Sequence, residues 1–183
     1  MHDAELAALA QAGDRGAFGE LVRRYAAKAR RVARAVLGDP DDADDAAQDG
    51  FLLALRHLGR YDPDRPFGPW LLRIVANAAT DRRRRRRVRA AEAIPPTVPA
   101  TGPAPDREAD RRALHAALED ALGTLPERQR VAVVLFDVEG YSHAEIAEVL
   151  GIPVGTVRSH VFHGRRALRR ALGAWRDWKE DTA

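Results

Sequence analysis

The sequence has no cysteine and no long hydrophobic run. The lack of cysteine excludes disulfide scaffolds, thiolate zinc sites and cysteine nucleophiles. No segment approaches the ~20 consecutive apolar residues that a membrane span needs. Met1 is followed by His2 and Asp3 rather than by a basic and then an apolar segment, which is not the pattern of a secretory signal. We therefore expect a soluble cytoplasmic protein that does not enter a membrane.

The composition is that of a globular protein with an uneven distribution of charge. Of its 183 residues, 45% are hydrophobic and 31% are charged, which is enough apolar material to bury a core. The net charge is only +3, but acidic residues gather in 39–50 and 131–150 and arginines in 82–89 and 151–173. Cationic blocks of this kind favour binding of a polyanion such as DNA. Each block taken alone is also typical of a solvated helix face.

A proline-rich stretch divides the chain into two parts. Residues 90–105 contain five prolines and cannot hold a helix, so they are expected to form an extended linker. Neither part shows strand alternation, and both show helical spacing of apolar residues. The sequence therefore predicts an all-α protein with two small helical domains, 1–89 and 107–183, joined by the linker 90–106.

Three helices are expected in the N-terminal domain. The first is capped by Asp14 and ends at Gly38, and the second covers about 41–58. The proline-containing segment 61–69 cannot be regular structure, so the third helix is expected to begin near Trp70. The predicted inward face of the second helix consists of Ala47, Phe51, Leu55 and Leu58.

The C-terminal domain has the pattern of a helix-turn-helix. Ser142 and Glu145 form a capping box, and Gly151 is suited to the left-handed turn between the two short helices. Val157 and Val161 are expected to face inward and hold the second helix against the first. The helices of this domain are predicted at about 107–122, 126–137, 142–150 and 153–175.

The second of these helices has the properties of a recognition helix. A recognition helix presents polar side chains near its N-terminus, where they reach base edges in the major groove. Arg158 is the best candidate for a bidentate contact with guanine. The further candidates for DNA contact are Thr156, Ser159, His160, Phe162, His163 and Arg165.

Taken together, these motifs resemble those of bacterial RNA polymerase sigma factors of the small, extracytoplasmic-function type. The matching C-terminal stretches, similar to the family's minus-thirty-five reader, are 125–130, 140–142, 145–147 and 153–159. In the N-terminal part, 17–18 and 42–51 are similar to the core-polymerase-binding helix, and 67–71 with Asn77 and 81–83 to the minus-ten segment. The motifs stand in the family's order on either side of a linker.

The resemblance implies a role for each block. The acidic helix would dock the clamp coiled coil of the polymerase β′ subunit through Asp45, Gln48, Asp49 and Leu52. The loop 61–69, which carries Tyr61 and Phe67, would capture an unpaired minus-ten base. The arginines 82–87 at the end of the third helix would hold the DNA backbone. The residues expected at the minus-ten element are Tyr61, Phe67, Trp70, Asn77, Asp81, Arg82 and Arg83. The linker would thread the channels of polymerase.

The resemblance also implies what else the chain binds. A sigma factor of this type would be a monomer when free, would have an anti-sigma partner, and would need no cofactor, metal or catalysis of its own. Two departures from the family pattern are His160 and His163, which stand where arginine is common and favour a different promoter element. Their spacing would also suit a metal pair or a pH response, although no third ligand is nearby.

Two other functions fit parts of the sequence. An autonomous helix-turn-helix regulator would use the C-terminal domain but would leave the acidic helix and the loop 61–69 without a role. A nucleic-acid hydrolase would use the aspartates to hold Mg²⁺, which requires carboxylates that converge in a cleft. Because these aspartates lie at an exposed helix start, the sequence argues against an enzyme.

Overall fold

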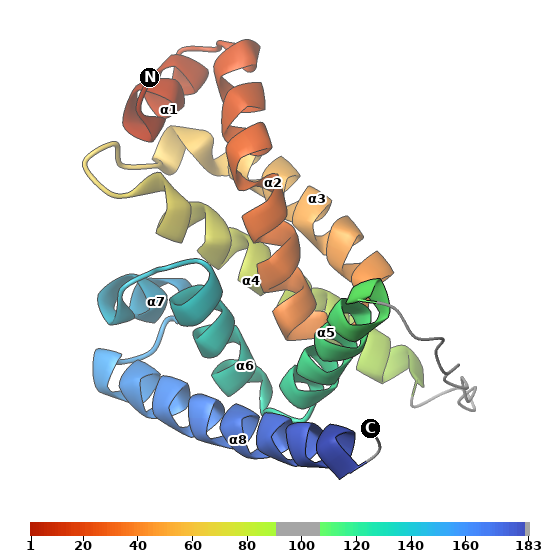
Figure 1. Ribbon diagram of the computed structural model, residues 1–183. Helices are drawn as coiled ribbons and strands as arrows, with labels where there is room; N and C mark the ends of the chain where they lie inside the picture. Colours follow the sequence, from red (N-terminus) through yellow and green to blue (C-terminus); the bar gives the residue numbers. More distant parts are fainter. Residues whose placement is uncertain (91–106, 182–183) are drawn as a thin grey trace.

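The computed structural model describes residues 1–90 and 107–181, and these ranges contain helices and turns but no strand (Figure 1). The all-α prediction is therefore confirmed. The predicted proline-rich linker lies outside the described residues, apart from Ala90. Within the described part, no helix is long and apolar enough to cross a membrane.

The N-terminal helices are α1 (Asp3–Gln11), α2 (Arg15–Leu37), α3 (Pro40–His57) and α4 (Phe67–Ala90), with a 3₁₀ turn η1 (Leu58–Arg60) after α3. The C-terminal helices are α5 (Arg107–Gly123), α6 (Glu127–Val133), α7 (His143–Leu150) and α8 (Val154–Asp181). A single π-helical turn, η2 (Val134–Val138), continues α6. In Figure 1, α1 lies at the opposite end of the molecule from α8.

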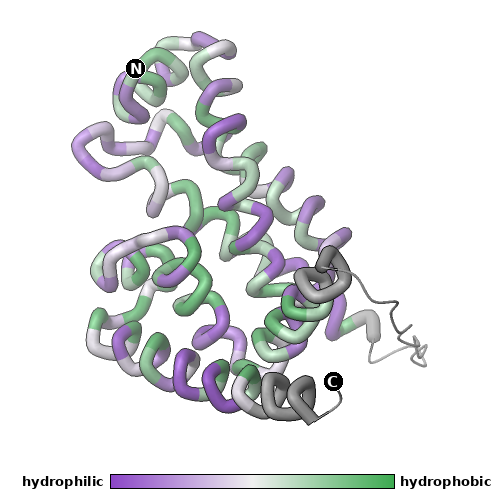
Figure 2. The backbone as a smooth tube through the Cα atoms, viewed as in Figure 1, coloured by the Kyte–Doolittle hydropathy of each residue, from purple (hydrophilic) through white to green (hydrophobic). Residues whose placement is uncertain are grey.

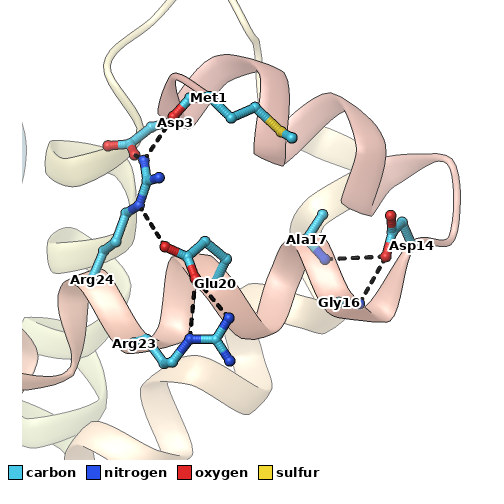
Figure 3. Close-up of polar contacts among 8 residues, drawn as sticks. All are labelled: Met1, Asp3, Asp14, Gly16, Ala17, Glu20, Arg23 and Arg24. Carbon is cyan, nitrogen blue, oxygen red and sulfur yellow. Dashed lines mark hydrogen bonds and ion pairs between the residues drawn. The ribbon is translucent and has the colours of Figure 1, made fainter.

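Helix α2 begins and ends where the sequence predicts. The Asp14 carboxylate accepts hydrogen bonds from the backbone N–H groups of Gly16 at 2.8 Å and Ala17 at 3.1 Å (Figure 3). At the other end Gly38 takes the left-handed conformation, with φ of 80°, which glycine adopts without steric cost. Both local signals are confirmed.

Helix α1 is not among the predicted elements, although it belongs to the core. Leu6 and Ala7 are buried against the other N-terminal helices. Asp3 joins α1 to α2, because its carboxylate accepts from Arg24 at 2.9 Å and from the Tyr25 hydroxyl at 2.6 Å (Figure 3 shows the Arg24 contact). A short alanine-rich helix gives little apolar periodicity, so its sequence resembles a loop more than an amphipathic helix.

Gly50 allows α3 and α4 to cross closely. A Cβ atom at this position would lie 2.7 Å from Val75 Cγ2 and 3.0 Å from Val75 Cα. Glycine inside a helix costs about 1 kcal/mol relative to alanine. Because the close crossing brings α3 onto the fully buried Val75 and Leu71, the packing explains why a glycine stands there.

Two details of the N-terminal prediction are wrong. Helix α4 begins at Phe67, three residues before Trp70, because Pro69 lies in its first turn, where a missing N–H costs no hydrogen bond. Leu55, predicted inward, is 49% exposed, whereas Ala47 and Leu58 are buried as predicted. Ala54, one position earlier, is fully buried instead, so the inward face of α3 runs through Ala47, Gly50 and Ala54 and leaves Leu55 on the outer face.

The helix-turn-helix prediction is confirmed in its local chemistry. Ser142 Oγ accepts from the Glu145 N–H at 3.3 Å, and the Ser142 N–H donates to the Glu145 carboxylate at 2.8 Å. Gly151 is left-handed with φ of 63°. Val157 and Val161 are buried, and Figure 2 shows hydrophilic and hydrophobic residues alternating along the coloured part of α8, as expected for a helix with one buried face.

The two halves of the molecule pack against one another. Helix α7 lies on α4, and α6 lies on α2. The Arg130 guanidinium donates to the carbonyl oxygens of Ala35 and Val36 at the end of α2. Arg65, in the loop before α4, pairs with Glu148 of α7 at 3.1 Å. Polar contacts and a shared core therefore join the N-terminal and C-terminal helices in this conformation.

Candidate nucleic-acid and protein interfaces

The start of α8 presents a polar surface with a buried reverse side. Val157 and Val161 anchor the helix, and most of the side chains around them are exposed. The exposed members are Thr156, Arg158, Ser159, Phe162, His163 and Arg165. Phe162 is 62% exposed, which is unusual for an aromatic residue and fits contact with a base or methyl group. Six of the seven sequence-predicted recognition residues, all but His160, are thus exposed along the start of α8.

His160 is the member of this group that is turned partly inward. It is half-buried, and burial lowers its pKa, with nearby Arg128 and His163 acting in the same direction. The lowered pKa favours the neutral imidazole, which has one donor and one acceptor. His160 therefore offers directional hydrogen bonding rather than positive charge.

Arg165 is already held by neighbouring residues. Its Nε donates to both carboxylate oxygens of Asp137, at 3.0 and 2.9 Å, and its guanidinium lies 4.9 Å from the centre of the Phe136 ring. The hydrogen bond to Asp137 raises the pKa of Arg165. The His143 ring also stacks on Phe136, with the two ring centroids 4.5 Å apart.

A hollow of about 590 Å³ lies beside the recognition helix. Its lining consists of Phe136, His143, Arg158, Val161, Phe162, Arg165, Arg166 and Arg169. The combination of guanidinium groups and aromatic faces suits a phosphate next to an apolar group. Sequence reasoning missed Phe136 and His143, because only the folded helix-turn-helix brings these positions next to α8.

The outer face of α3 is acidic, with exposed apolar residues beside it. Asp45 and Asp49 have side chains 63% and 60% exposed, and Leu52 is 49% exposed. Gln48, Asp49 and Leu52 follow Asp45 by three, four and seven residues, so with the exposed Gln48 these positions share one side of the helix. Leu55, also 49% exposed, extends the same stripe and was not among the predicted docking residues.

The acidic face of α3 and the basic end of α4 are in contact. Arg82 pairs with Asp42 at 3.1 Å, with Asp45 at 2.5 Å and with Asp49 at 3.8 Å. Arg86 pairs with Asp42 at 2.7 Å. The sequence suggested separate acidic and basic surfaces, and in this respect it is wrong. Asp45 and Asp49 nevertheless remain mostly exposed, so the face still offers negative charge to a partner.

These ion pairs change the acid–base properties of their members. The hydrogen bond from Arg82 holds the pKa of Asp42 below its usual range, and Arg86 adds to this effect. The same hydrogen bond raises the pKa of Arg82. Both groups are charged at neutral pH, so the contact is a charge pair throughout the physiological range.

The other predicted minus-ten residues on α4 differ in accessibility. Asn77 and Asp81 are exposed. The Arg83 side chain is 30% exposed and pairs with Glu127 of α6. Burial lowers the pKa of Arg83, and the nearby Arg87 and Arg130 act in the same direction. The helix end thus combines accessible polar groups with an arginine that is tied to the C-terminal half.

The aromatic residues of the loop before α4 are packed inward. Tyr61 and Phe67 are each 3% exposed, with ring centroids 5.4 Å apart, and Trp70 is half-buried against both. Their rings pack against Tyr25 and Trp70 in the core, so in this conformation neither ring is accessible to a base, and their role at the minus-ten element stays a prediction. The exposed part of the loop is 62–66.

Helix α1 holds the start of this loop in place. The Gln11 side-chain amide donates to the carbonyl oxygens of Leu58 at 2.8 Å and Tyr61 at 2.9 Å. The Tyr61 hydroxyl then donates to the Arg65 carbonyl across the loop. The loop shape is therefore fixed by side chains beneath it, which no linear motif indicated.

The described residues include no group of three or more histidine, aspartate or glutamate side chains that could hold a metal ion. His160 and His163 thus have no third ligand among them. The aspartates of α3 face arginines and solvent rather than a shared cleft. The arrangement is suited to binding charged macromolecules.

Comparison with known families identifies two matching segments. The family described as "Sigma-70 region 2" matches residues 21–89, and the one described as "Sigma-70, region 4" matches residues 115–168. The first segment covers most of α2 to α4, and the second contains the helix-turn-helix. The first match includes the acidic face of α3 and the basic end of α4, and the second includes the start of α8.

Several characterised proteins resemble the whole chain. The ECF RNA polymerase sigma factor SigM of Mycobacterium tuberculosis is 43% identical over 93% of this chain and 85% of its own length. SigW of Bacillus subtilis, also an ECF RNA polymerase sigma factor, is 32% identical over 87% of this chain and 91% of its own. Among solved structures, CnrH in complex with the cytosolic domain of CnrY matches with a TM-score of 0.69 and 34% identity, over 94% of this chain and 97% of CnrH.

Proposed function

Because the chain belongs to the extracytoplasmic-function (ECF) sigma factors of RNA polymerase and directs promoter-specific transcription initiation, we propose how its exposed surfaces divide that work. The N-terminal domain, 1–89, binds core polymerase and the minus-ten element. The C-terminal domain, 107–183, reads the minus-thirty-five element, and 90–106 connects them. The family matches to 21–89 and 115–168 support these boundaries.

The docking surface for core polymerase is the outer stripe of α3. Its exposed carboxylates call for a basic partner, and by family resemblance that partner is the clamp coiled coil of the β′ subunit. The exposed leucines next to Asp45 and Asp49 supply apolar area at the centre of such a contact. The proposed docking residues are Asp45, Gln48, Asp49, Leu52 and, added from the structure, Leu55.

The minus-ten element is bound by the exposed loop 62–66 and the outer end of α4. The backbone and polar groups of the loop are accessible, whereas Tyr61 and Phe67 support it from below. Asn77 and Asp81 lie along the exposed side of α4. The arginines that follow contact phosphates without reading sequence, as charge contacts to the DNA backbone do.

The minus-thirty-five element is read by the start of α8. Arg158 supplies the main base contact, with Thr156, Ser159 and His163 beside it. The hollow next to the helix receives a backbone phosphate between its arginines. The observation that carries this assignment is the exposure of Arg158 on a helix whose other side is locked by the buried Val157 and Val161.

We also propose that the chain binds an anti-sigma factor. The similar structure of CnrH contains the cytosolic domain of CnrY. A protein that covers either the acidic stripe or the recognition helix would prevent holoenzyme formation or promoter binding. We further propose that the free chain is a cytoplasmic monomer that catalyses no reaction itself.

Reconstituted transcription tests the proposal. Purified chain is mixed with core polymerase and with a library of randomised promoters, and the transcripts are sequenced. The proposal expects transcripts that begin downstream of two spaced elements and that depend on the added chain. Sequence-specific DNA binding without association with core polymerase would instead indicate an autonomous regulator.

A further inference from the structure

Asp42 lies between the proposed docking stripe and the basic end of α4 and belongs to neither. Its side chain is 24% exposed, and it accepts hydrogen bonds from Arg82 Nε at 3.1 Å and Arg86 Nη1 at 2.7 Å. Arg82 reaches onward to Asp45 at 2.5 Å and Asp49 at 3.8 Å. Direct contacts therefore run from Arg86 through Asp42 to Arg82, and from Arg82 to the docking aspartates Asp45 and Asp49.

The same charges are needed by two external partners. A basic partner on α3 requires Asp45 and Asp49, and a DNA phosphate requires the guanidinium groups of α4. Ion pairs as exposed as these are weak and exchange partners readily. Cations that arrive at Asp45 and Asp49 displace Arg82 from these carboxylates and repel it. Binding of polymerase to Asp45 and Asp49 thus weakens the ion pairs between α3 and α4 that oppose DNA binding. Binding of DNA to the α4 arginines likewise weakens the pairs that oppose polymerase binding.

We propose that Asp42 is a positioning residue that holds Arg82 and Arg86 on the acidic face of the free chain, so that docking of polymerase releases them to DNA. The inference rests on the proposed docking stripe and adds a coupling between it and the DNA-binding end of α4. Coupling between two binding events is reciprocal, so release of these arginines also favours docking.

The first experiment measures DNA binding by the full chain without polymerase. Asp42→Asn is compared with Asp41→Asn, which makes the same change of charge one residue away. Asp41 is exposed and forms no ion pair with any side chain that the structure describes. A fluorescent promoter duplex is titrated at several salt concentrations, so that both the affinity and its salt dependence are obtained.

The proposal expects Asp42→Asn to bind DNA about fivefold more tightly than wild type, a size typical of coupling between sites. It also expects the slope of log K against log salt to steepen by about one, as for one additional phosphate contact. Asp41→Asn changes both values less. The effect of Asp42→Asn disappears in an Arg82→Gln, Arg86→Gln background, and Asp42→Glu keeps wild-type affinity. Equal effects of Asp42→Asn and Asp41→Asn, or persistence in that background, would overturn the proposal.

The second experiment measures core polymerase binding without DNA and uses variants of the arginines. Arg82→Gln frees Asp45 and Asp49 and should tighten core binding by about fivefold. Arg85→Gln, an exposed arginine of the same block, should leave it unchanged. Unchanged or weaker binding by Arg82→Gln would overturn the coupling. This arm does not depend on Asp42→Asn, and thermal unfolding of every variant is recorded alongside.

The failure of the docking stripe itself is read separately. Asp45→Asn combined with Asp49→Asn must weaken core binding if the stripe is the docking surface. The docking assignment is overturned if that variant binds core polymerase normally while the effect of Asp42→Asn on DNA binding still depends on Arg82. The coupling alone is overturned if that variant binds core polymerase weakly but the effect of Asp42→Asn on DNA binding does not depend on Arg82.

Discussion

The two basic surfaces of this sigma factor differ in what their arginines already hold. At the start of α8, Arg158 is exposed and forms no ion pair with a side chain that the structure describes. At the end of α4, Arg82 and Arg86 lie on the aspartates of α3, and Arg83 lies on Glu127. On the α8 surface Arg158 stays accessible while Arg165 is paired with Asp137, whereas on the α4 surface Arg82, Arg83 and Arg86 are all held by the protein itself.

This difference suits the proposed roles of the two surfaces. A reader of base edges must keep its donors free, because specificity depends on hydrogen bonds made directly to bases. A surface that grips the DNA backbone would bind any sequence if it were always free. Under the proposed roles, internal pairing would therefore limit nonspecific binding at α4 and leave the specific contact at α8 available.

Reversing the charge of the docking stripe should have the largest effect. Asp45→Lys combined with Asp49→Lys places like charges against a basic partner, which costs several kcal/mol. We expect core binding to fall by more than about 100-fold, and transcription to fall at every promoter. Surface plasmon resonance with immobilised core polymerase measures the loss. Asp120→Lys, at an exposed aspartate on α5 to which no docking role is assigned, is the control and should retain most of the affinity.

Removing the guanidinium at the start of α8 should have a smaller and selective effect. Arg158→Ala loses a base contact worth about 1–3 kcal/mol, so promoters that carry the cognate base lose activity and others do not. Arg166→Ala, a matched loss of one exposed arginine on α8, should weaken binding uniformly and reduce the salt slope by about one. Electrophoretic mobility shift with a set of single-base promoter variants distinguishes the two patterns. A uniform loss for both variants would remove Arg158 from the reading role.

The close crossing of α3 and α4 at Gly50 can be tested through the stability of the chain. Gly50→Ala brings a Cβ to 2.7 Å from Val75 Cγ2 and should destabilise the chain by about 1–3 kcal/mol, as overpacking does. Gly19→Ala, in α2 with nothing within 4 Å of the added Cβ, should stabilise it by about 0.4–1 kcal/mol. Urea denaturation followed by circular dichroism gives both values. Equal stability of the two variants would show that α3 and α4 do not cross closely at Gly50.

The smallest expected effect concerns the pH dependence of the reading surface. The folded state lowers the pKa of His160, so folding favours its neutral form. This contribution is present above the unfolded pKa of about 6.5 and is lost as the pH falls through the lower folded value. His160→Gln should therefore flatten the decline of stability below that pH. Thermal unfolding across pH 5 to about 8 measures it, with substitution of the exposed His57 on α3, His57→Gln, as the control.

Local features of the fold could be predicted because nearby residues determine them. The cap at Asp14, the box at Ser142 and Glu145, and the left-handed turns at Gly38 and Gly151 each depend on a few consecutive residues. The spacing of Val157 and Val161 was enough to place the recognition face. Helix α1 was missed because its burial comes from packing against α2, not from its own periodicity.

The remaining features of the site depend on contacts between distant residues. Tyr61 and Phe67 look like a binding platform in a proline-rich loop, and only the packing of α1, α2 and α4 shows that they are buried. The pair Arg82–Asp42 joins residues forty positions apart, so it depends on the rotational phase of two helices. Charge blocks indicate where charge lies along the chain but not which blocks neutralise one another.

Titration of core polymerase in a transcription assay tests the division of labour most directly. Wild type, the Asp45→Lys, Asp49→Lys variant and Arg158→Ala are each assayed on a promoter panel at increasing concentrations of core polymerase. The account predicts that excess core polymerase restores the aspartate variant at all promoters together and leaves the promoter-selective defect of Arg158→Ala unchanged. Recovery of Arg158→Ala by core polymerase, or a promoter-selective defect in the aspartate variant, would contradict it.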